Sequence, residues 1–460
     1  MKAPFDIAAD LDTPVSAFRK LAPFEPRFLL ESVEGGERLG RYSFIGFGDG
    51  LTVRMADNEL AIDGVSQPIP AQRSALLDVL REALALAPRP GPEVGVPFPG
   101  GLVGATSYDL VRRLEPVGEA VSPQSDSPEA LYIAPRSVLA FDHLTRRVAL
   151  LHDGPEAERL ALRKEVIAAL RGALPPPRRT GRVGPASHSF SRDDFMDAVR
   201  TVQGHISDGE VFQLVLSVAM SGTAEVDPFE VYRALRLLNP SPYMYYFAAD
   251  QTAVVGSSPE ALVRLEGRTA TLRPIAGTRP RGTSPAHDAA LADELLADQK
   301  ELAEHVMLVD LARNDLGRVA TPGSVRVAPY RNIERYSHVM HTVSGVDGEL
   351  ARDHDAFDLF AATFPAGTVV GAPKVRAMQL IDELEPVRRG LYAGTVGYFG
   401  HGGGMDQAIA IRTLVFEGDR YTYQAGAGIV ADSSPQREHE EVLAKAGALR
   451  AALELAEAGL

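Results

Sequence analysis

Hydrophobic and polar positions alternate in the segment VFQLVLSVAM, residues 211–220. Successive side chains of a strand point to opposite faces of its sheet. Phe212 and Leu214 therefore share one face, whereas Gln213 and Ser217 lie on the other face among valines. A polar pair on an otherwise apolar face fits a strand that lines a cavity, and it also fits a face exposed to water. The alternation alone leaves both interpretations open.

Other strand-like segments follow one another as hairpins more often than they alternate with helices. Residues 251–277 predict a strand, a loop and then a hairpin that turns at Glu266, Gly267 and Arg268. The segments LYAGTVGYF and MDQAIAIRTLVFEGDRYTYQAGAGIV continue this order. We therefore expect an α+β fold with large antiparallel sheets, and not a doubly wound nucleotide-binding fold.

A change in composition predicts the division of the chain. Residues 174–190, LPPPRRTGRVGPASHSF, combine prolines, glycines and a basic cluster, as is typical of a linker. A helix is predicted for residues 156–174, and Ser191 is a suitable N-cap for the helix that follows the linker. We therefore expect an N-terminal region, residues 1–173, and a C-terminal domain, residues 191–460, which suits a chain of this length.

Two predicted helices each carry two carboxylates one turn apart. Glu301 and Glu304 interrupt the apolar segment KELAEHVMLVDLARND, and Glu438 and Glu441 lie near the start of a helix predicted for residues 435–458. An isolated buried carboxylate is costly, so it is normally paired, protonated or bound to a metal ion. The two pairs are therefore candidates for one shared site.

Composition restricts which ion such a site would bind. The chain contains no cysteine, so oxygen ligands would select a hard cation, Mg²⁺ before Mn²⁺ or Ca²⁺. Ordinary pairing is the alternative: Glu301 with a nearby cation, and Glu441 with Lys445 in an i,i+4 surface pair worth about 0.3–0.5 kcal/mol. The spacing does not decide between them.

Charge and hydropathy exclude several classes of partner. The formal net charge of −14 disfavours nucleic acid or an anionic membrane as the main partner. No apolar run approaches the roughly 18 residues of a membrane span, and the N-terminus has no apolar signal core. Together with the absence of cysteine, these features lead us to expect a cytoplasmic protein.

The glycine-rich segments do not predict a nucleotide site. Gly426 and Gly428 in QAGAGIV form no phosphate-binding motif and open no helix after a strand. Glycine does let a ligand approach the main chain, so their amides could bind a carboxylate. A bulge or a tight turn would explain these glycines equally well.

Several blocks together resemble the chorismate-utilising enzymes. The blocks are PIAGTRPRG, ELAEHVMLVDLARNDLGRV, YSHVMHTVSG, GTVVGAPKVRAMQLI, YAGTVGYF, QAGAGIV and the helix with Glu438 and Glu441. They keep the family's order over residues 191–455, and RFLLESVEGGERLGRYSFIG resembles the N-terminal domain of anthranilate synthase component I. The resemblance implies antiparallel sheets packed as a sandwich with helices outside, a chorismate-binding catalytic domain, and a regulatory contribution from the N-terminal region.

Two positions point to one branch of this family. Water-using members carry a lysine base where this chain has Gln213, and a neutral glutamine cannot deprotonate water. Aminodeoxychorismate synthases carry a nucleophilic lysine where this chain has Ala276. The resemblance therefore implies amination of chorismate by ammonia to give anthranilate and pyruvate, the first step of tryptophan biosynthesis. An aminodeoxyisochorismate synthase and a non-catalytic tryptophan-sensing subunit are the alternatives.

The resemblance also implies roles for individual residues. Glu260 would be the general acid for the departing hydroxyl, His341 would assist loss of pyruvate, and Gln213 would lie beside them. Glu304 and Glu441 would bind Mg²⁺, supported by Glu301 and Glu438. The residues implied in chorismate binding are Gly277, Thr278, Thr368, Tyr392, Arg412, Gly426, Ala427, Gly428 and Lys445.

An inhibitor site and a partner subunit complete these expectations. Ser32, Pro242, Tyr243 and Met244 resemble the tryptophan inhibitor site of anthranilate synthases, and a proline–aromatic–methionine wall can hold an indole. A core strand is the alternative for the last three residues. Since no cysteine can serve as a glutaminase nucleophile, ammonia would come from a separate glutamine amidotransferase subunit, in an expected heterotetramer, or be supplied free.

Overall fold

The computed structural model describes residues 5–32, 40–56, 58–118, 127–176, 181–336 and 339–460. Most of its strands belong to two large antiparallel sheets. In the first, the strands follow the order β1 (Ile7–Ala8), β10 (Arg147–His152), β9 (Ser137–Asp142), β3 (Tyr42–Phe47), β2 (Phe28–Glu31), β13 (Tyr243–Ala249), β14 (Thr252–Ser258), β25 (Thr413–Glu417), β26 (Arg420–Ile429), β12 (Gln213–Thr223) and β11 (Ser187–His188), with β22 (Gly371–Ala372) paired to β12.

The second sheet has the order β18 (Arg326–Val327), β21 (Val346–Glu349), β16 (Thr269–Leu272), β15 (Ala261–Glu266), β24 (Met405–Ile409), β23 (Thr395–Gly400), β7 (Gly101–Thr106), β8 (Ala130–Ala134), β4 (Leu51–Ala56), β5 (Glu59–Ile62) and β6 (Val65–Pro68). A small third sheet has the order β17 (Ile275–Pro280), β20 (Val339–Val343) and β19 (Asn332–Arg335).

The two large sheets pack face to face. One buried cluster contains Phe28 and Phe247 from the first sheet and Val103 and Tyr398 from the second. Phe98 lies between them, with its ring centroid 6.2 Å from that of Phe28 and 4.8 Å from that of Tyr398. Burial of these apolar faces provides the main favourable term for the packing. The α+β sandwich expected from the sequence is therefore confirmed.

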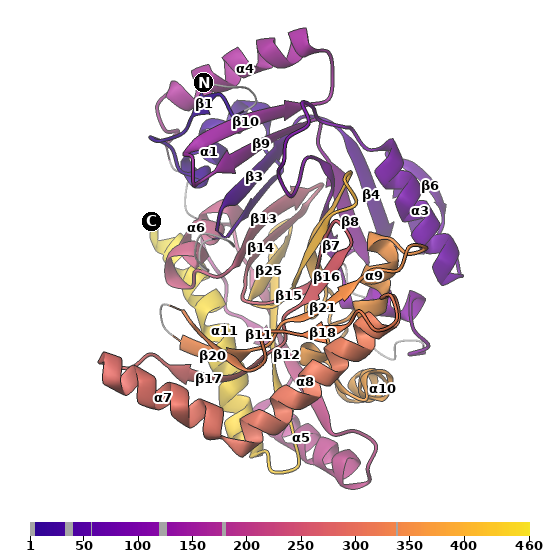
Figure 1. Cartoon of the computed structure of the whole chain (residues 1–460). Helices are drawn as coiled ribbons and strands as arrows, with labels where there is room; N and C mark the ends of the chain where they lie inside the picture. Colours follow the sequence, from indigo (N-terminus) through magenta and orange to yellow (C-terminus); the bar gives the residue numbers. More distant parts are fainter. Residues whose placement is uncertain (1–4, 33–39, 57, 119–126, 177–180, 337–338) are drawn as a thin grey trace.

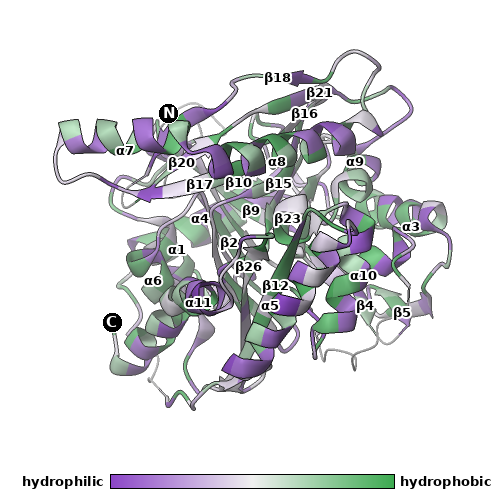
Figure 2. Cartoon of the chain, turned by 90° about the horizontal axis from the view of Figure 1, so that it is seen from below, coloured by the Kyte–Doolittle hydropathy of each residue, from purple (hydrophilic) through white to green (hydrophobic). Residues whose placement is uncertain are grey.

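Helices cover the outside of this sandwich (Figure 1). They are α1 (Pro14–Lys20), α3 (Arg73–Leu86), α4 (Glu156–Arg171), α5 (Arg192–Ser207), α6 (Pro228–Leu238), α7 (Pro285–Ala297), α8 (Gln299–Gly317), α9 (Ala356–Thr363), α10 (Lys374–Leu384) and α11 (Pro435–Ala458). Short 3-10 turns are η1 (Ala22–Phe24), η2 (Tyr108–Arg113) and η3 (Gly367–Val369). Figure 2 shows α5, α8 and α11 around one end of β12 and β26. No helix within the described residues is long and apolar enough to cross a membrane.

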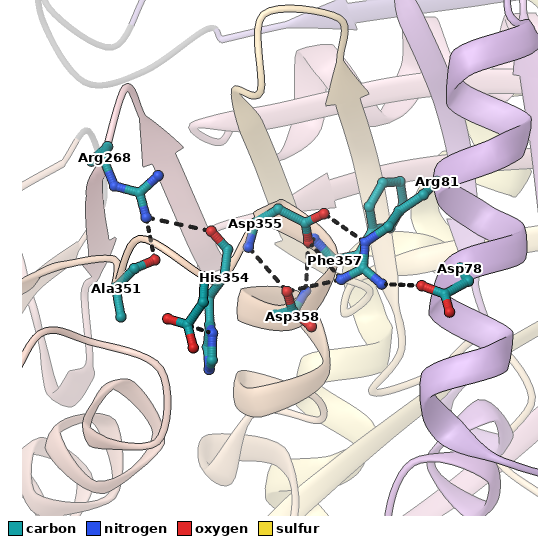
Figure 3. Close-up of polar contacts among 9 residues, drawn as sticks. Asp78, Arg81, Arg268, Ala351, His354, Asp355, Phe357 and Asp358 are labelled. Atoms are coloured by element: carbon teal, nitrogen blue, oxygen red, sulfur yellow. Dashed lines mark hydrogen bonds and ion pairs between the residues drawn. The ribbon is translucent and has the colours of Figure 1, made fainter.

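Both large sheets combine strands from the two sides of the predicted linker. β2 pairs with β13 in the first sheet, and β7 pairs with β23 in the second. An ion pair also links residues from the two sides of the predicted linker (Figure 3): Nε of Arg81 in α3 lies 2.6 Å from Oδ2 of Asp355. Asp355 caps α9 by accepting from the backbone N–H groups of Phe357 and Asp358. The residues assigned to two regions therefore share sheets and side-chain contacts.

Local sequence signals correctly placed several elements. The Ser191 side chain caps α5, and β15 and β16 form the hairpin predicted around Gly267. α4 ends at Arg171, earlier than predicted, because Gly172 leaves the helical conformation. Phe212 was expected to share a sheet face with Leu214. It instead precedes β12, and 74% of it is exposed.

Candidate active site

A cavity of about 670 Å³ lies where β12 and β26 meet α8, α11 and the small third sheet. The residues predicted for catalysis, for metal binding and for substrate binding line this cavity, with the exception of Ala427. Ala427 is completely buried in the main core instead, because alternation along β26 points its side chain away from its glycine neighbours. Gln213 and Val215 line the cavity, whereas Ser217, the other polar residue of this strand face, is buried beside Glu385 and does not line it. The cavity interpretation of this face is therefore confirmed for Gln213 and not for Ser217.

The four predicted metal ligands line the same cavity from two helices. Burial, reinforced by the nearby Glu301, raises the pKa of Glu304. Burial also raises the pKa of Glu438, and Glu441 contributes to that rise. Both shifts indicate negative charge that the surrounding protein does not fully compensate.

The ordinary pairing that was the alternative interpretation is also present. Arg279 Nη1 lies 3.5 Å from Glu301 Oε1, and Lys445 Nζ lies 2.7 Å from Glu441 Oε1. Lys445 also donates to the backbone oxygen of Gly426 at 3.0 Å. Lys445 therefore connects Glu441 directly to β26.

The donor set fits a hard divalent cation. Within the described residues, no group of three or more acidic or histidine side chains is close enough to hold one ion, so carboxylates of α8 and α11 would have to move together around it. The uncompensated charge on Glu304 and Glu438 favours this change, and carboxylate oxygens are the ligands that Mg²⁺ prefers.

Glu260 has the electrostatics of a general acid. It lies immediately before β15 and only 9% of the residue is exposed. Burial raises its pKa to about 8, and the hydroxyl of Thr368 offsets part of this rise. The Thr368 hydroxyl has no hydrogen bond of normal geometry in the described part of the chain. Glu260 is therefore largely protonated at neutral pH and can donate a proton into the cavity.

His341 lies on the small sheet, with one ring nitrogen engaged. Its Nδ1 atom lies 3.1 Å from the backbone oxygen of Gly277 and 3.0 Å from Oγ1 of Thr278. Because a carbonyl only accepts, Nδ1 carries the proton and Nε2 carries the free lone pair. Burial lowers the pKa of His341, so the ring is neutral and can act as a base.

Close approach explains the glycines of β26. Residues 420–429 of β26 pair with β12 in one continuous register, so there is no bulge at this point. A Cβ atom on Gly426 would lie 2.6 Å from the Tyr392 hydroxyl, and one on Gly428 would lie 2.3 Å from Gln213 Nε2. Burial raises the pKa of Tyr392 to about 12, which keeps its hydroxyl protonated. The wall therefore presents small residues beside hydrogen-bond donors.

Arg412 reaches the cavity from a strained position. The sequence placed it within a strand, but in the structure it lies between β24 and β25 with a φ of 50°. A non-glycine residue adopts this left-handed conformation only where tertiary structure imposes it. The conformation ends one strand, and the Arg412 residue lines the cavity.

Sequence reasoning missed two polar residues of the cavity, Lys300 and Gln424. Lys300 lies one helical turn before Glu304, and Gln424 lies two positions before Gly426 on the same strand face. The helical and strand periods that identified their neighbours could have identified both.

The four residues predicted for the inhibitor site line a second, separate cavity. Ser32, Pro242, Tyr243 and Met244 share it with Glu31 and Asp406. The Glu31 carboxylate is fixed by Arg236, whose Nε atom is 3.1 Å away. No residue lines both this cavity and the larger one.

Comparisons with known proteins agree on one group. A family model described as chorismate binding enzyme matches residues 25–451. Anthranilate synthase component 1 of Thermus thermophilus is 46% identical over 98% of this chain and 97% of the relative, and that of Streptomyces coelicolor is 42% identical over 98% and 88%. The crystal structure of anthranilate synthase component I from Streptococcus pneumoniae superimposes with a TM-score of 0.80 at 33% identity, covering 98% of this chain and 100% of the other.

Proposed function

Since the chain belongs to the chorismate-binding enzyme family, we propose that it is the chorismate-converting component of an anthranilate synthase. It combines chorismate with ammonia and releases anthranilate and pyruvate, the first step of tryptophan biosynthesis. The observation that carries the proposal is the buried, protonated Glu260 in the same cavity as two carboxylate pairs. A protonated buried acid can assist departure of a hydroxyl group, and carboxylates that bind a divalent cation would supply the positive charge that an anionic ring requires.

Glu304 and Glu441 would bind Mg²⁺, with Glu301 and Glu438 in support. When bound, the ion supplies positive charge that neutralises and orients the ring carboxylate of chorismate. Lys445 and Lys300 add further positive charge around this end of the cavity.

The remaining polar groups orient the other carboxylate and the ring. The enolpyruvyl carboxylate would be bound by Arg412, the Tyr392 hydroxyl and the backbone amides of Gly426 and Gly428. It has space beside the two glycines because they lack side chains. Gly277 and Thr278 would contact the ring from the small sheet. Two anchored carboxylates would fix the ring relative to Glu260.

The reaction then needs proton transfers in two stages. Ammonia adds at C2 and gives up one proton from its nitrogen, the ring double bonds shift, and the C4 hydroxyl leaves as water with the proton that Glu260 donates. Loss of the proton at C2 makes the ring aromatic, and the enolpyruvyl group departs from C3 and takes up a proton to become pyruvate. His341, neutral with a free Nε2, would assist this second stage. Gln213 is neutral, in keeping with ammonia rather than an activated water as the nucleophile.

Regulation and ammonia supply belong to the same proposal. The second cavity, with Ser32, Pro242, Tyr243 and Met244, would bind tryptophan and inhibit the enzyme. The chain contains no cysteine, so glutamine would be hydrolysed on a separate glutamine amidotransferase subunit. Without that subunit, ammonium should support turnover and glutamine should not.

Anthranilate fluorescence provides the test. The wild-type chain with chorismate, Mg²⁺ and ammonium should produce a strongly fluorescent product, and Glu304→Ala should lose activity across the whole Mg²⁺ titration. No fluorescent product from the wild type would contradict the assigned reaction. An unchanged Mg²⁺ dependence in Glu304→Ala would contradict the metal assignment alone.

A further inference from the structure

A buried ion pair lies behind one wall of the large cavity. Nη2 of Arg389 lies 2.7 Å from Oε1 of Glu385, Nε lies 2.9 Å from Oε2, and the two side chains are only 1% and 3% exposed. Removing two charges from water is costly, so such a pair is tolerated only where its other donors and acceptors are also satisfied. Arg389 meets this condition through two residues that line the cavity, and Glu385 meets it through Ser217, which contacts a third.

The Arg389 guanidinium donates to two backbone carbonyls of that wall. Nη1 donates to the oxygen of Val369 at 2.7 Å, and Nη2 donates to the oxygen of Val215 at 2.7 Å. Val215 belongs to β12 and Val369 ends η3, and both line the cavity. The backbone N–H of Val215 also donates to the oxygen of Val370 at 2.8 Å, beside the pairing of β12 with β22. The planar guanidinium therefore adds two side-chain hydrogen bonds to a backbone contact between these segments.

Glu385 extends the same network to β26. Its Oε1 atom accepts from the backbone N–H of Ser217 at 2.9 Å and from the Ser217 hydroxyl at 2.6 Å. The Ser217 oxygen in turn accepts from Nε2 of Gln424 at 2.7 Å. Gln424 lines the cavity, so the carboxylate of Glu385 fixes its amide through one intervening hydroxyl.

Two aromatic rings lie close to the guanidinium. The Cζ atom of Arg389 lies 5.0 Å from the ring centroid of Tyr108 and 5.5 Å from that of Tyr392. Cation–π attraction at these distances restrains both rings. Tyr108 is held in turn, because its backbone N–H donates to the oxygen of Gly390 at 2.7 Å. The Glu385–Arg389 ion pair thereby also fixes Tyr392, whose hydroxyl faces Gly426.

We propose that Glu385 and Arg389 are positioning residues that set the wall of Val215, Val369, Tyr392 and Gln424 for the enolpyruvyl carboxylate of the substrate. Neither of the two lines the cavity, so they act through the residues they hold. The inference rests on the proposed function, in which Tyr392 binds that carboxylate. A lysine keeps the charge of Arg389 but cannot make the same set of directed hydrogen bonds.

Arg389→Lys tests the inference. Because the wall would bind the carboxylate in both the ground and transition states, the variant should raise KM for chorismate by about tenfold or more, with a smaller change in kcat. Arg112→Lys is the matched control. Arg112 forms a two-point ion pair with Asp382 of α10 at 2.6 Å, and neither residue lines the cavity. The control should leave KM unchanged.

A double-mutant cycle distinguishes positioning from a general loss of structure. If Arg389 acts through Tyr392, the fold-increase in KM of the double variant should be smaller than the product of the increases in Arg389→Lys and Tyr392→Phe. Multiplicative effects, an unchanged KM in Arg389→Lys, or an equal rise in Arg112→Lys would overturn the inference.

Ser217→Ala covers the case in which Arg389→Lys does not fold. This variant removes one hydroxyl between Glu385 and Gln424, so a higher KM without a change in thermal unfolding supports the inference, and an unchanged KM overturns it. Failure of the proposed function is recognised separately, because the wild type would then give no anthranilate in the same assay.

Discussion

The side chains of Gln213 and Glu304 meet across the cavity, with Nε2 of Gln213 3.4 Å from Oε1 of Glu304. A lysine at position 213 would place an ammonium group beside this carboxylate and compete with a divalent cation for it. We expect Gln213→Lys to raise the Mg²⁺ concentration for half-maximal activity by about tenfold or more. Gln213→Met, neutral and similar in length, is the control. Equal Mg²⁺ requirements for both variants would contradict the prediction.

The metal-free protein should gain stability when Glu304 is made neutral. Burial and Glu301 raise its pKa, and a carboxyl whose folded pKa is raised costs stability as the pH rises through that value. Glu304→Gln should therefore raise the unfolding temperature in EDTA at about pH 8 and change it little in acid. Glu440→Gln, at an exposed position of α11, the other helix that carries acidic residues of the cavity, should show no such difference. Added Mg²⁺ should stabilise the wild type more than Glu304→Gln.

The fall of kcat at alkaline pH should follow the ionisation of Glu260. Since burial raises its pKa to about 8, the proton needed for the departing hydroxyl is lost as the pH rises through that value. We expect kcat to fall above about pH 8 with the slope of one ionisation. Glu260→Gln should lower kcat by about 10²–10⁴. Glu266 is an exposed residue at the end of β15, the strand that follows Glu260, and the pH profile of Glu266→Gln should match the wild type. A wild-type profile that stays flat to high pH would exclude Glu260 as the acid.

Elements with strong local signals could be predicted from the sequence. Helix α11 spans Pro435–Ala458 as expected, because a proline start and helical periodicity are properties of adjacent residues. The one-turn spacing of Glu301 and Glu304 correctly indicated a shared face, and both residues line the cavity. Arg412 was not predictable in this way. Its left-handed backbone conformation leaves no signal in the local pattern AIAIRTL, which is typical of a continuous strand.

The Glu385–Arg389 pair shows the same limit. In the sequence it is an i,i+4 pair of opposite charge, which is typical of a solvated helix face. Its burial depends on the carbonyl of Val215, 174 positions away, and on the ring of Tyr108. Neither contact leaves a periodic signal near Arg389. Long-range partners decide whether such a pair is a surface feature or part of a binding wall.

A methyl group at position 426 should interfere with binding at the same wall. The added Cβ of Gly426→Ala would lie 2.6 Å from the Tyr392 hydroxyl and 3.0 Å from the oxygen of Leu216, so Tyr392 or the strand must move. We expect a KM for chorismate raised by about tenfold or more. Gly402→Ala is the matched control, because its Cβ would meet nothing within 4 Å. Similar KM values for the two variants would show that close approach at Gly426 is unimportant.

Tryptophan inhibition should depend on Ser32 without involving catalysis. Ser32 lies in the second cavity, beside the fixed carboxylate of Glu31, and a hydroxyl contact of about 0.5–1.5 kcal/mol corresponds to roughly two- to twelvefold in affinity. Ser32→Ala should weaken inhibition to this extent and leave kcat and KM for chorismate unchanged. Because the chain contains no tryptophan, the fluorescence of added tryptophan measures binding directly, with Ser66→Ala on the exposed strand β6 as control. A Ser32→Ala variant that binds tryptophan normally would place the inhibitor elsewhere.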